Sequence, residues 1–322
     1  MKMNSFSLQS GKKFKGEIYL LLMTVLWGGT FVIIKESLNS ASPMIFVGIR
    51  FTTAFLILLP VLIFTKRTFN KKTLISGFAL GLLTFFSFAT QTVGLKFTSA
   101  TKSAFLTGSC VVIIPFVQTI VEKRKPTTGA AIGALFVFGG VVFLSSGGSS
   151  FLNIFRELGG NFNIGDFFTL LCALFWAFQV VYLDIISQKF DYLLLVVAQV
   201  AVCAVMGFIS AIILDASNIE SFYIKINDNL ILGILYTAIF ATVITTTIQT
   251  KYQKEVTPTK AGIIYSFEPI FASVFAFFIL NEKMSNFGLI GCVLIFSGLI
   301  ISEIYDSLVK NGHFKSKSGN FS

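Results

Sequence analysis

The sequence predicts an all-α integral membrane protein of ten transmembrane helices, arranged as two inverted five-helix repeats. Three observations lead to this fold class: the composition, a series of long apolar segments, and an internal similarity between the two halves. Of the 322 residues, 54% are hydrophobic and only 12% are charged, whereas soluble domains carry about 25% charged residues. The composition therefore argues against an ordinary soluble protein.

Ten segments are long and apolar enough to cross, or nearly cross, a hydrocarbon core of about 30 Å at a rise of about 1.5 Å per residue. In chain order they are 18–34, 42–64, 73–95, 103–121, 128–146, 167–183, 192–214, 229–250, 259–280 and 284–302. Arg50 and Glu268 interrupt two of them. All four cysteines fall within these segments, so we interpret them as small packing residues and not as disulfide partners or metal ligands.

Basic residues are distributed unequally between the two sides of the predicted membrane. If the N-terminus is cytoplasmic, 17 Lys and Arg residues lie in cytoplasmic tails and loops and five lie in the opposite loops. This bias predicts a multi-pass protein of the plasma membrane with both termini in the cytoplasm. The net charge of +10 then reflects attraction to the anionic lipid bilayer, so no nucleic-acid partner is expected.

The two halves resemble each other in sequence. GEIYLLLMTVLWGGTF, from residue 16, aligns with GDFFTLLCALFWAFQV, from residue 165, which pairs Glu17 with Asp166 and Trp27 with Trp176. A register of 158 residues then matches TKSA at 101–104 with TKAG at 259–262, and Gln91 with Gln249. Because five spans is an odd number, the second unit must enter the membrane from the opposite side, which favours alternating access.

The repeat sets the expected domain boundaries. They are a basic cytoplasmic tail at 1–16, a first repeat at 17–146, a flexible external loop at 147–164, a second repeat at 165–305 and a cytoplasmic tail at 306–322.

Three motifs occur in a fixed order: LWGGTF in the first span, GLKFTSATKSAFLTG leading into the fourth, and TPTKAGIIYSFEPIFASVFAFFILNEK around the ninth. Together they resemble the ten-span EamA-type members of the drug/metabolite transporter superfamily, over about residues 16–302. The resemblance implies a carrier, commonly an exporter, of small organic solutes such as amino acids, with a central cavity. The sequence has no ATP-binding phosphate loop and no metal-ligand cluster within the spans, so no cofactor or metal is expected.

Glu268 is the most unusual residue of the apolar segments. It lies about 14 Å along its helix from residue 259, near the middle of the membrane, where a charge costs about 2.5–3.5 kcal/mol. It should therefore face the cavity, as a proton carrier, or form a structural hydrogen bond, for example with the hydroxyls of residues 245–247. Aligning Pro115 with Pro269 places Ile114 opposite it.

Other polar and aromatic side chains at mid-depth are expected to turn inward. Amides cannot be satisfied by lipid, and the two tryptophans lie away from the interfacial belt. Interhelical hydrogen bonding and plain packing are the alternatives. With Glu268, the predicted cavity residues are Trp27, Gln91, Trp176, Gln179, Gln249 and Tyr265.

Prolines and lysines complete the candidates. Pro115 and Pro269 should kink their helices and free the carbonyls of Val111 and Tyr265. Lys102 and Lys260 open the fourth and ninth spans, where they could attract anionic solutes to the two mouths or extend to the interface.

Two further groups are given structural roles. Arg50 is expected to form an ion pair or to extend to the interface. The glycines of the fifth and tenth spans should permit close helix approach, within the bundle or across a homodimer; they are Gly133, Gly139, Gly140, Gly291 and Gly298.

The sequence therefore predicts a secondary transporter of small organic metabolites, not an enzyme, with proton coupling as an option. Two alternatives stay open: a passive channel or facilitator, and an intramembrane lipid-modifying enzyme. The enzyme would need a nucleophile or a paired acid and base, and the sequence offers a lone carboxylate. The sequence does not specify the solute, the direction, the coupling ion or the oligomeric state.

Overall fold

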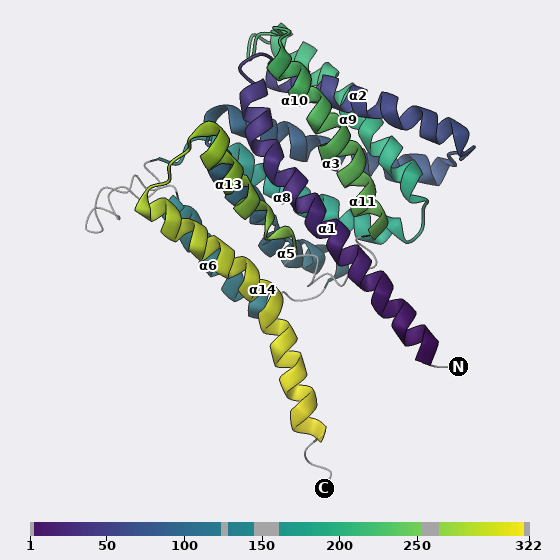
Figure 1. The fold of residues 1–322 in the computed structure, drawn as a ribbon, viewed down its shortest axis with the longest axis vertical. Coiled ribbons are helices and arrows are strands. Elements are labelled where there is room, and N and C mark those ends of the chain that lie inside the picture. The colour runs from purple at the N-terminus through teal and green to yellow at the C-terminus, as the bar shows by residue number, and fades with distance from the viewer. Residues whose placement is uncertain (1–2, 124–127, 145–160, 253–263, 319–322) are drawn as a thin grey trace.

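The computed structural model describes residues 3–123, 128–144, 161–252 and 264–318, most of which are helical (Figure 1). The helices are α1 (Met3–Ser37), α2 (Pro43–Phe64), α3 (Lys71–Phe97), α4 (Ala100–Gly108), α5 (Cys110–Glu122), α6 (Thr128–Leu144), α8 (Ile164–Ser187), α9 (Tyr192–Ala216), α10 (Asp228–Ala238), the π-helix η2 (Ile239–Ile244), α11 (Thr245–Tyr252), α13 (Glu268–Leu280) and α14 (Asn286–Ser318). Most of the predicted loop 147–164 lies outside the described residues, and so does Lys260.

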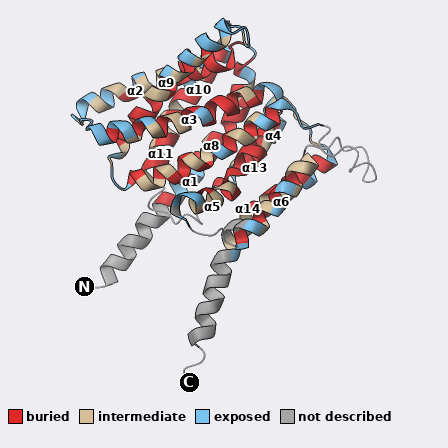
Figure 2. Ribbon diagram, turned by 180° about the vertical axis from the view of Figure 1, so that it is seen from behind, coloured by how far each residue is buried: buried red, intermediate tan, exposed pale blue. Residues whose placement is uncertain are grey.

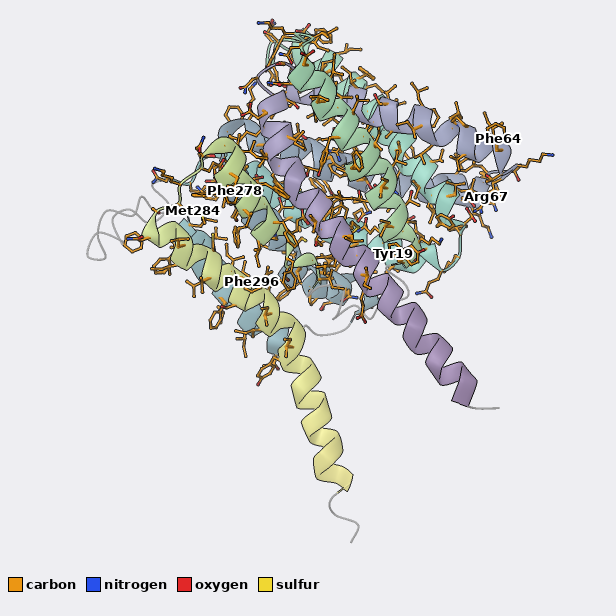
Figure 3. All side chains as sticks on the ribbon, viewed as in Figure 1. Tyr19, Phe64, Arg67, Phe278, Met284 and Phe296 are labelled. Atoms are coloured by element: carbon orange, nitrogen blue, oxygen red, sulfur yellow. The ribbon has the colours of Figure 1, made fainter. Side chains whose placement is uncertain are left out.

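The distribution of polar side chains is typical of a protein embedded in lipid. Among the described residues, seven helical segments are long and apolar enough to span a membrane, and three shorter apolar helices accompany them. Phe64 and Phe278 are 83% and 74% exposed and project from the perimeter (Figure 3). Arg50, Asp166 and Gln199, by contrast, are buried in the interior, which is coloured red in Figure 2. The predicted all-α membrane fold is therefore confirmed.

α6 and α14 lie side by side at one edge of the molecule (Figure 1). Their backbones approach closely: a Cβ added to Gly140 would lie 2.7 Å from the Gly291 carbonyl oxygen, and one added to Gly298 would lie 2.7 Å from that of Gly133. Small residues let helices in a membrane approach in this way. Gly139 differs, because a Cβ there would meet open space.

Hydrogen bonds at one end of the bundle fix the directions of α1, α3 and α8. Lys35, near the end of α1, donates from Nζ to the carbonyl oxygens of Leu95 and Thr98 at the end of α3, at 3.2 and 2.5 Å. The Thr98 hydroxyl donates to Asp166, in the first turn of α8, at 2.6 Å. α8 therefore begins where α1 and α3 end, and it runs opposite to α1. We call this the Asp166 end of the bundle.

The remaining long pairings connect the two halves of the chain. α3 lies against α8 and α9, α1 against α13 and against α10 and α11, and α2 against α9. Both chain ends extend from the side opposite the Asp166 end (Figure 1). These pairings bring residues from both halves to the centre of the bundle.

Three of the predicted spans are interrupted near their middle. The fourth span divides at Ser109, between α4 and α5, and the eighth contains the π-helix η2. In the ninth span, Ser266 and Phe267 form a turn before α13 begins at Glu268.

The interruption of the ninth span lies at the predicted Pro269 kink, because Ser266 and Phe267 fall between Tyr265 and this proline; the break of the fourth span does not coincide with Pro115. α5 continues through Pro115, six residues after the break at Ser109, and Pro269 is the second residue of α13. Proline is well accommodated in the first helical turn because its missing N–H would have no intrahelical partner there.

Candidate functional site

A small polar cavity lies at the centre of the bundle, bounded by α1, α3, α4, α5, α8 and α13. Its lining consists of Trp27, Thr30, Ser87, Phe88, Gln91, Thr107, Gly108, Cys110, Val111, Cys172, Trp176, Tyr265 and Glu268. Five of the seven predicted cavity residues are therefore brought together: the two tryptophans, Gln91, Tyr265 and Glu268.

The two indoles form one wall of the cavity. Trp27 and Trp176 meet edge to face, with ring centroids 5.4 Å apart and an interplanar angle of 82°. Trp27 also lies 6.3 Å from the ring of Tyr265, and its Nε1 donates a 2.9 Å hydrogen bond to the Thr245 hydroxyl. Trp176 in turn packs edge to face on Phe88, with centroids 5.6 Å apart. This aromatic wall can contact apolar groups and cations.

Glu268 places a carboxylate against this wall. Its side chain is half-buried because it borders the cavity, and no basic side chain among the described residues forms an ion pair with it. The predicted alternative of a hydrogen bond to the threonines of α11 receives no support at two of the three positions. Thr245 instead accepts from Trp27, and the Thr247 hydroxyl donates to the Val243 carbonyl.

Two possible registers between the halves pair Glu268 with different residues of the first half. Alignment of the prolines pointed to Ile114, which does not line the cavity. Cys110 does, and it lies 158 residues before Glu268, in the register that also pairs Gln91 with Gln249. The helix breaks favour this register, because Cys110 and Glu268 are each the first residue of the helix that follows a break.

The same register identifies lining residues that we did not predict. Thr107 lies 158 residues before Tyr265 and faces the cavity with it. The Gln91 side chain donates a 3.4 Å hydrogen bond to the Thr107 hydroxyl, and the side chain of Gln249 interacts with Tyr265. The unpredicted lining residues are small, polar or aromatic, and periodicity alone does not distinguish them from packing residues; they are Thr30, Ser87, Phe88, Thr107, Gly108, Cys110, Val111 and Cys172.

Gln179 and Gln249 are buried but do not line the cavity. Gln179 Oε1 and Gln249 Nε2 have no hydrogen-bond partner among the described residues. A buried amide atom without a hydrogen bond lowers the stability of the protein. A rearrangement of the site that gives these two atoms hydrogen-bond partners would therefore be favoured.

Lys102 does not present a free charge at the mouth of the cavity. Its Nζ lies 2.5 Å from an oxygen of Asp166, whose side chain is fully buried. Asp166 also accepts hydrogen bonds from the Thr98 hydroxyl and the Asn163 backbone N–H. We predicted that Lys102 would attract solutes or extend to the interface. In the structure it forms an ion pair instead, because the acidic first turn of α8 lies against the start of α4.

A second acidic residue, Glu282, forms hydrogen bonds at the Asp166 end. Glu282, in the connection between α13 and α14, accepts hydrogen bonds from the backbone N–H groups of Ala100 and Thr101, at 2.8 and 3.1 Å. These are N–H groups of the first turn of α4, which lack intrahelical partners. The Asp166 end is therefore joined by charged contacts that involve α1, α3, α4, α8 and the α13–α14 connection.

The cavity is contracted in this structure. Its volume is about 30 Å³, enough for a water molecule or two, whereas sites for organic ligands measure roughly 300–1,000 Å³. An organic solute could enter only after the surrounding helices move apart.

The fold and the site together define a class: a multi-helical membrane protein with a polar central cavity contributed by both halves of the chain. The EamA-like transporter family matches residues 14–146 and again residues 163–303. The chain belongs to this family, and the predicted resemblance is confirmed.

Individual relatives support the same class. An uncharacterized transporter of Archaeoglobus fulgidus is 30% identical, over 93% of this chain and 91% of its own length. A probable amino-acid metabolite efflux pump of Escherichia coli is 24% identical, over 89% of this chain and 94% of its own. A solved crystal structure with 13% identity has a TM-score of 0.63 and covers 92% of this chain and 99% of that one, which supports the fold alone. The family and the names of these relatives indicate a transporter.

Proposed function

We propose that this protein is a secondary transporter that exports a small organic metabolite of the amino-acid kind across the plasma membrane. The observation that carries the proposal is the central cavity, which combines two indoles, an amide and a carboxylate that forms no ion pair with any described residue, in a bundle whose perimeter is apolar. Amino-acid metabolites carry charged groups and often an apolar side chain, and this lining offers a partner for both. The Escherichia coli relative and a second relative from Salmonella typhimurium are both probable amino-acid metabolite efflux pumps, which supports the same solute class.

The proposed mechanism is alternating access between two inverted repeats, residues 17–146 and 165–305. The opposite directions of α1 and α8 support inversion. So does the helix pairing: the third span of the first repeat (α3) lies against the first span of the second repeat (α8), and the third span of the second repeat (α10 and α11) lies against the first span of the first repeat (α1). In such a pair of repeats, an exchange of conformations converts a cavity open to one side into a cavity open to the other.

The contacts at the Asp166 end would then hold one access route shut. The sequence bias in basic residues makes this the external end, with both termini in the cytoplasm. Opening this route requires the Lys102–Asp166 pair and the contacts of Glu282 with α4 to separate. We infer that solute binding in the cavity helps to offset the free energy of that separation.

Glu268 is the proposed coupling group. Glu268 lines the cavity, where its carboxyl group could hold a proton in one access state and release it in the other. Protonation would then alternate with access, which would couple solute export to proton entry.

The test is transport by the purified full-length protein in proteoliposomes. A thermal-shift screen with amino acids, nucleotides and cationic drugs first selects a stabilising solute. Efflux of that radiolabelled solute should saturate with concentration and should accelerate when unlabelled solute is present on the opposite side. Control liposomes contain the Trp27→Ala/Trp176→Ala protein, which lacks the aromatic wall.

Two results would reject the proposal. Flux that rises linearly with concentration and shows no trans-stimulation would assign the protein to passive channels. Conversion of bilayer lipids by the purified protein, without movement of any solute, would assign it to intramembrane enzymes.

A further inference from the structure

Among the residues that the structure describes, Arg50 is the largest side chain that is completely enclosed in the bundle, at 1% exposure. It lies on α2, and no carboxylate among the described residues forms an ion pair with it. The predicted ion pair or interfacial extension is therefore not what the structure contains. A buried guanidinium in a membrane protein is costly unless it is hydrogen-bonded, and such residues commonly mark a function.

One side of the guanidinium stacks on aromatic rings. Its central carbon lies 4.6 Å from the ring centroid of Phe88 and 5.2 Å from that of Phe51. Phe88 lines the cavity, and its ring packs edge to face on Trp176. Arg50 thus touches the ring that supports one of the two indoles from behind.

The other side of Arg50 is bound to the π-helix. Nε donates to the Thr242 hydroxyl at 3.0 Å, and one terminal nitrogen donates to the Ala241 carbonyl at 3.1 Å. Thr242 and Ala241 both belong to η2, a single π-helical turn, and such turns are rare and frequent at functional sites. The residue directly after η2 is Thr245, whose hydroxyl accepts the hydrogen bond of Trp27.

We propose that Arg50 is a positioning residue that sets the arrangement of both cavity indoles from outside the cavity. Through Phe88 it supports Trp176, and through η2 and Thr245 it orients Trp27. Arg50 does not line the contracted cavity, so it acts on the solute only through these neighbours. The effect of Arg50 on solute recognition rests on the proposed transport function. Its effect on the positions of the two indoles does not depend on that function.

The other half of the chain provides a matched comparison. Gln199 lies 149 residues after Arg50, in the register that pairs the two tryptophans, and Thr84 lies 158 residues before Thr242. Thr84 donates to Gln199 Oε1 at 3.1 Å, so the two links occupy equivalent places. α3, however, is a continuous helix, and neither Gln199 nor Thr84 lines the cavity.

The experiment uses the fact that the chain has only two tryptophans. Trp27→Phe and Trp176→Phe proteins each report on the one remaining indole by its emission spectrum and by acrylamide quenching. Into each background we would introduce Arg50→Gln, Arg50→Lys, Thr242→Val or Gln199→Leu. Secondary structure by circular dichroism and elution as a single species establish that each variant is folded.

Arg50→Gln should shift the emission of both indoles and at least double their quenching constants. Arg50→Lys should do so nearly as strongly, because lysine keeps the charge but lacks the planar set of donors. Thr242→Val should alter Trp27 alone, and Gln199→Leu should alter neither. Unchanged spectra in a folded Arg50→Gln protein would overturn the proposal, as would equal shifts in the Gln199→Leu control.

Thr242→Val decides the question if Arg50→Gln does not fold, because it removes one acceptor and leaves the guanidinium in place. An unaltered Trp27 spectrum in that variant overturns the relay through η2. In transport assays, Thr242→Val should raise KM more than it changes the maximal rate. The spectra need no solute, so failure of the transport proposal would leave the positioning result intact.

Discussion

The two halves of the chain have similar contacts but place different chemistry in them. Two contacts join the halves: Thr84 of the first half contacts Gln199 of the second, whereas Thr242 of the second half contacts Arg50 of the first. Where the first half has Cys110 at the helix break, the second half has Glu268. α3 is continuous, whereas the matching span contains η2. The proposed duplication thus preserves the arrangement of the helices, while the charged residues Arg50 and Glu268 are matched by the uncharged residues Gln199 and Cys110.

The acidic residues at the start of each half illustrate the same difference. Asp166 is fully buried and paired with Lys102, whereas Glu17, its match in sequence, is only half-buried. Residues at equivalent positions of the two halves are therefore expected to contribute unequally to stability. Paired substitutions at equivalent positions can test how far this inequality extends.

The largest difference is expected between Asp166 and Glu17. Asp166→Ala leaves the Lys102 ammonium without its partner at a buried site, which should lower the free energy of unfolding by about 3–5 kcal/mol. Glu17→Ala should lower it by a smaller amount, because Glu17 is only half-buried and solvent screens the interactions of a partly exposed charge. Reversible unfolding in detergent measures both. The double variant Lys102→Met/Asp166→Ala should recover part of the loss, and equal losses in the two single variants would contradict this comparison.

The next largest difference concerns Glu268 and Cys110. Glu268→Gln should lower the solute export rate at least about tenfold, or about 1.4 kcal/mol in the barrier, and should abolish its pH dependence. Cys110→Ser should retain both the rate and the pH dependence within a factor of about two, a change of less than ~0.5 kcal/mol. Proteoliposome flux across a range of external pH values provides the measurement. A normal pH response in the Glu268→Gln protein would remove proton coupling from the mechanism.

A smaller difference is expected between Thr245 and Ser87, which lie 158 residues apart beside the two indoles. Thr245→Val deprives Trp27 Nε1 of its acceptor and should cost about 1 kcal/mol of stability. Ser87 donates to the Leu83 carbonyl within its own helix, so Ser87→Ala should cost less than about 0.5 kcal/mol. Thermal unfolding of both proteins measures the difference. Equal losses in the two proteins would mean that the two indoles are held alike and would contradict this prediction.

The smallest effect should separate Gln91 from Gln249. Gln91 lines the cavity, so Gln91→Leu should raise the KM for export about threefold, as expected for one modest hydrogen bond. Gln249 lies behind Tyr265, and Gln249→Leu should leave KM within about 1.5-fold of the parent, a change of less than ~0.3 kcal/mol. Initial rates over a range of solute concentrations would resolve the two. The reverse order would place the second amide, not the first, in contact with solute.

Several features of the site could be predicted because a membrane makes polar residues conspicuous. Trp27, Trp176, Gln91, Tyr265 and Glu268 stand out in apolar segments, and all five line the cavity. Gln179 and Gln249 satisfied the same criterion but lie behind the lining. Polarity at mid-depth predicts that a side chain avoids lipid, but it does not distinguish the cavity from a buried interhelical contact.

Other features had no signal in the sequence. Thr107 and Cys110 became recognisable only through the helix breaks, since small residues serve equally well in packing. The ion pair between Lys102 and Asp166 joins residues 64 positions apart in the chain, and the links from Arg50 to η2 span more than 190 positions. Position in the sequence does not specify such contacts.

By itself, the sequence determined that this chain is a membrane-embedded helical protein of two similar halves, because long apolar segments, flanking charges and repeated motifs follow from local composition and from the thickness of a bilayer. Only the tertiary structure decided which polar groups share a cavity, which are closed off in pairs, and how Arg50 reaches both indoles. Those contacts depend on where helices from distant parts of the chain cross. The crossings arise from side-chain packing summed over many residues, which no short pattern records.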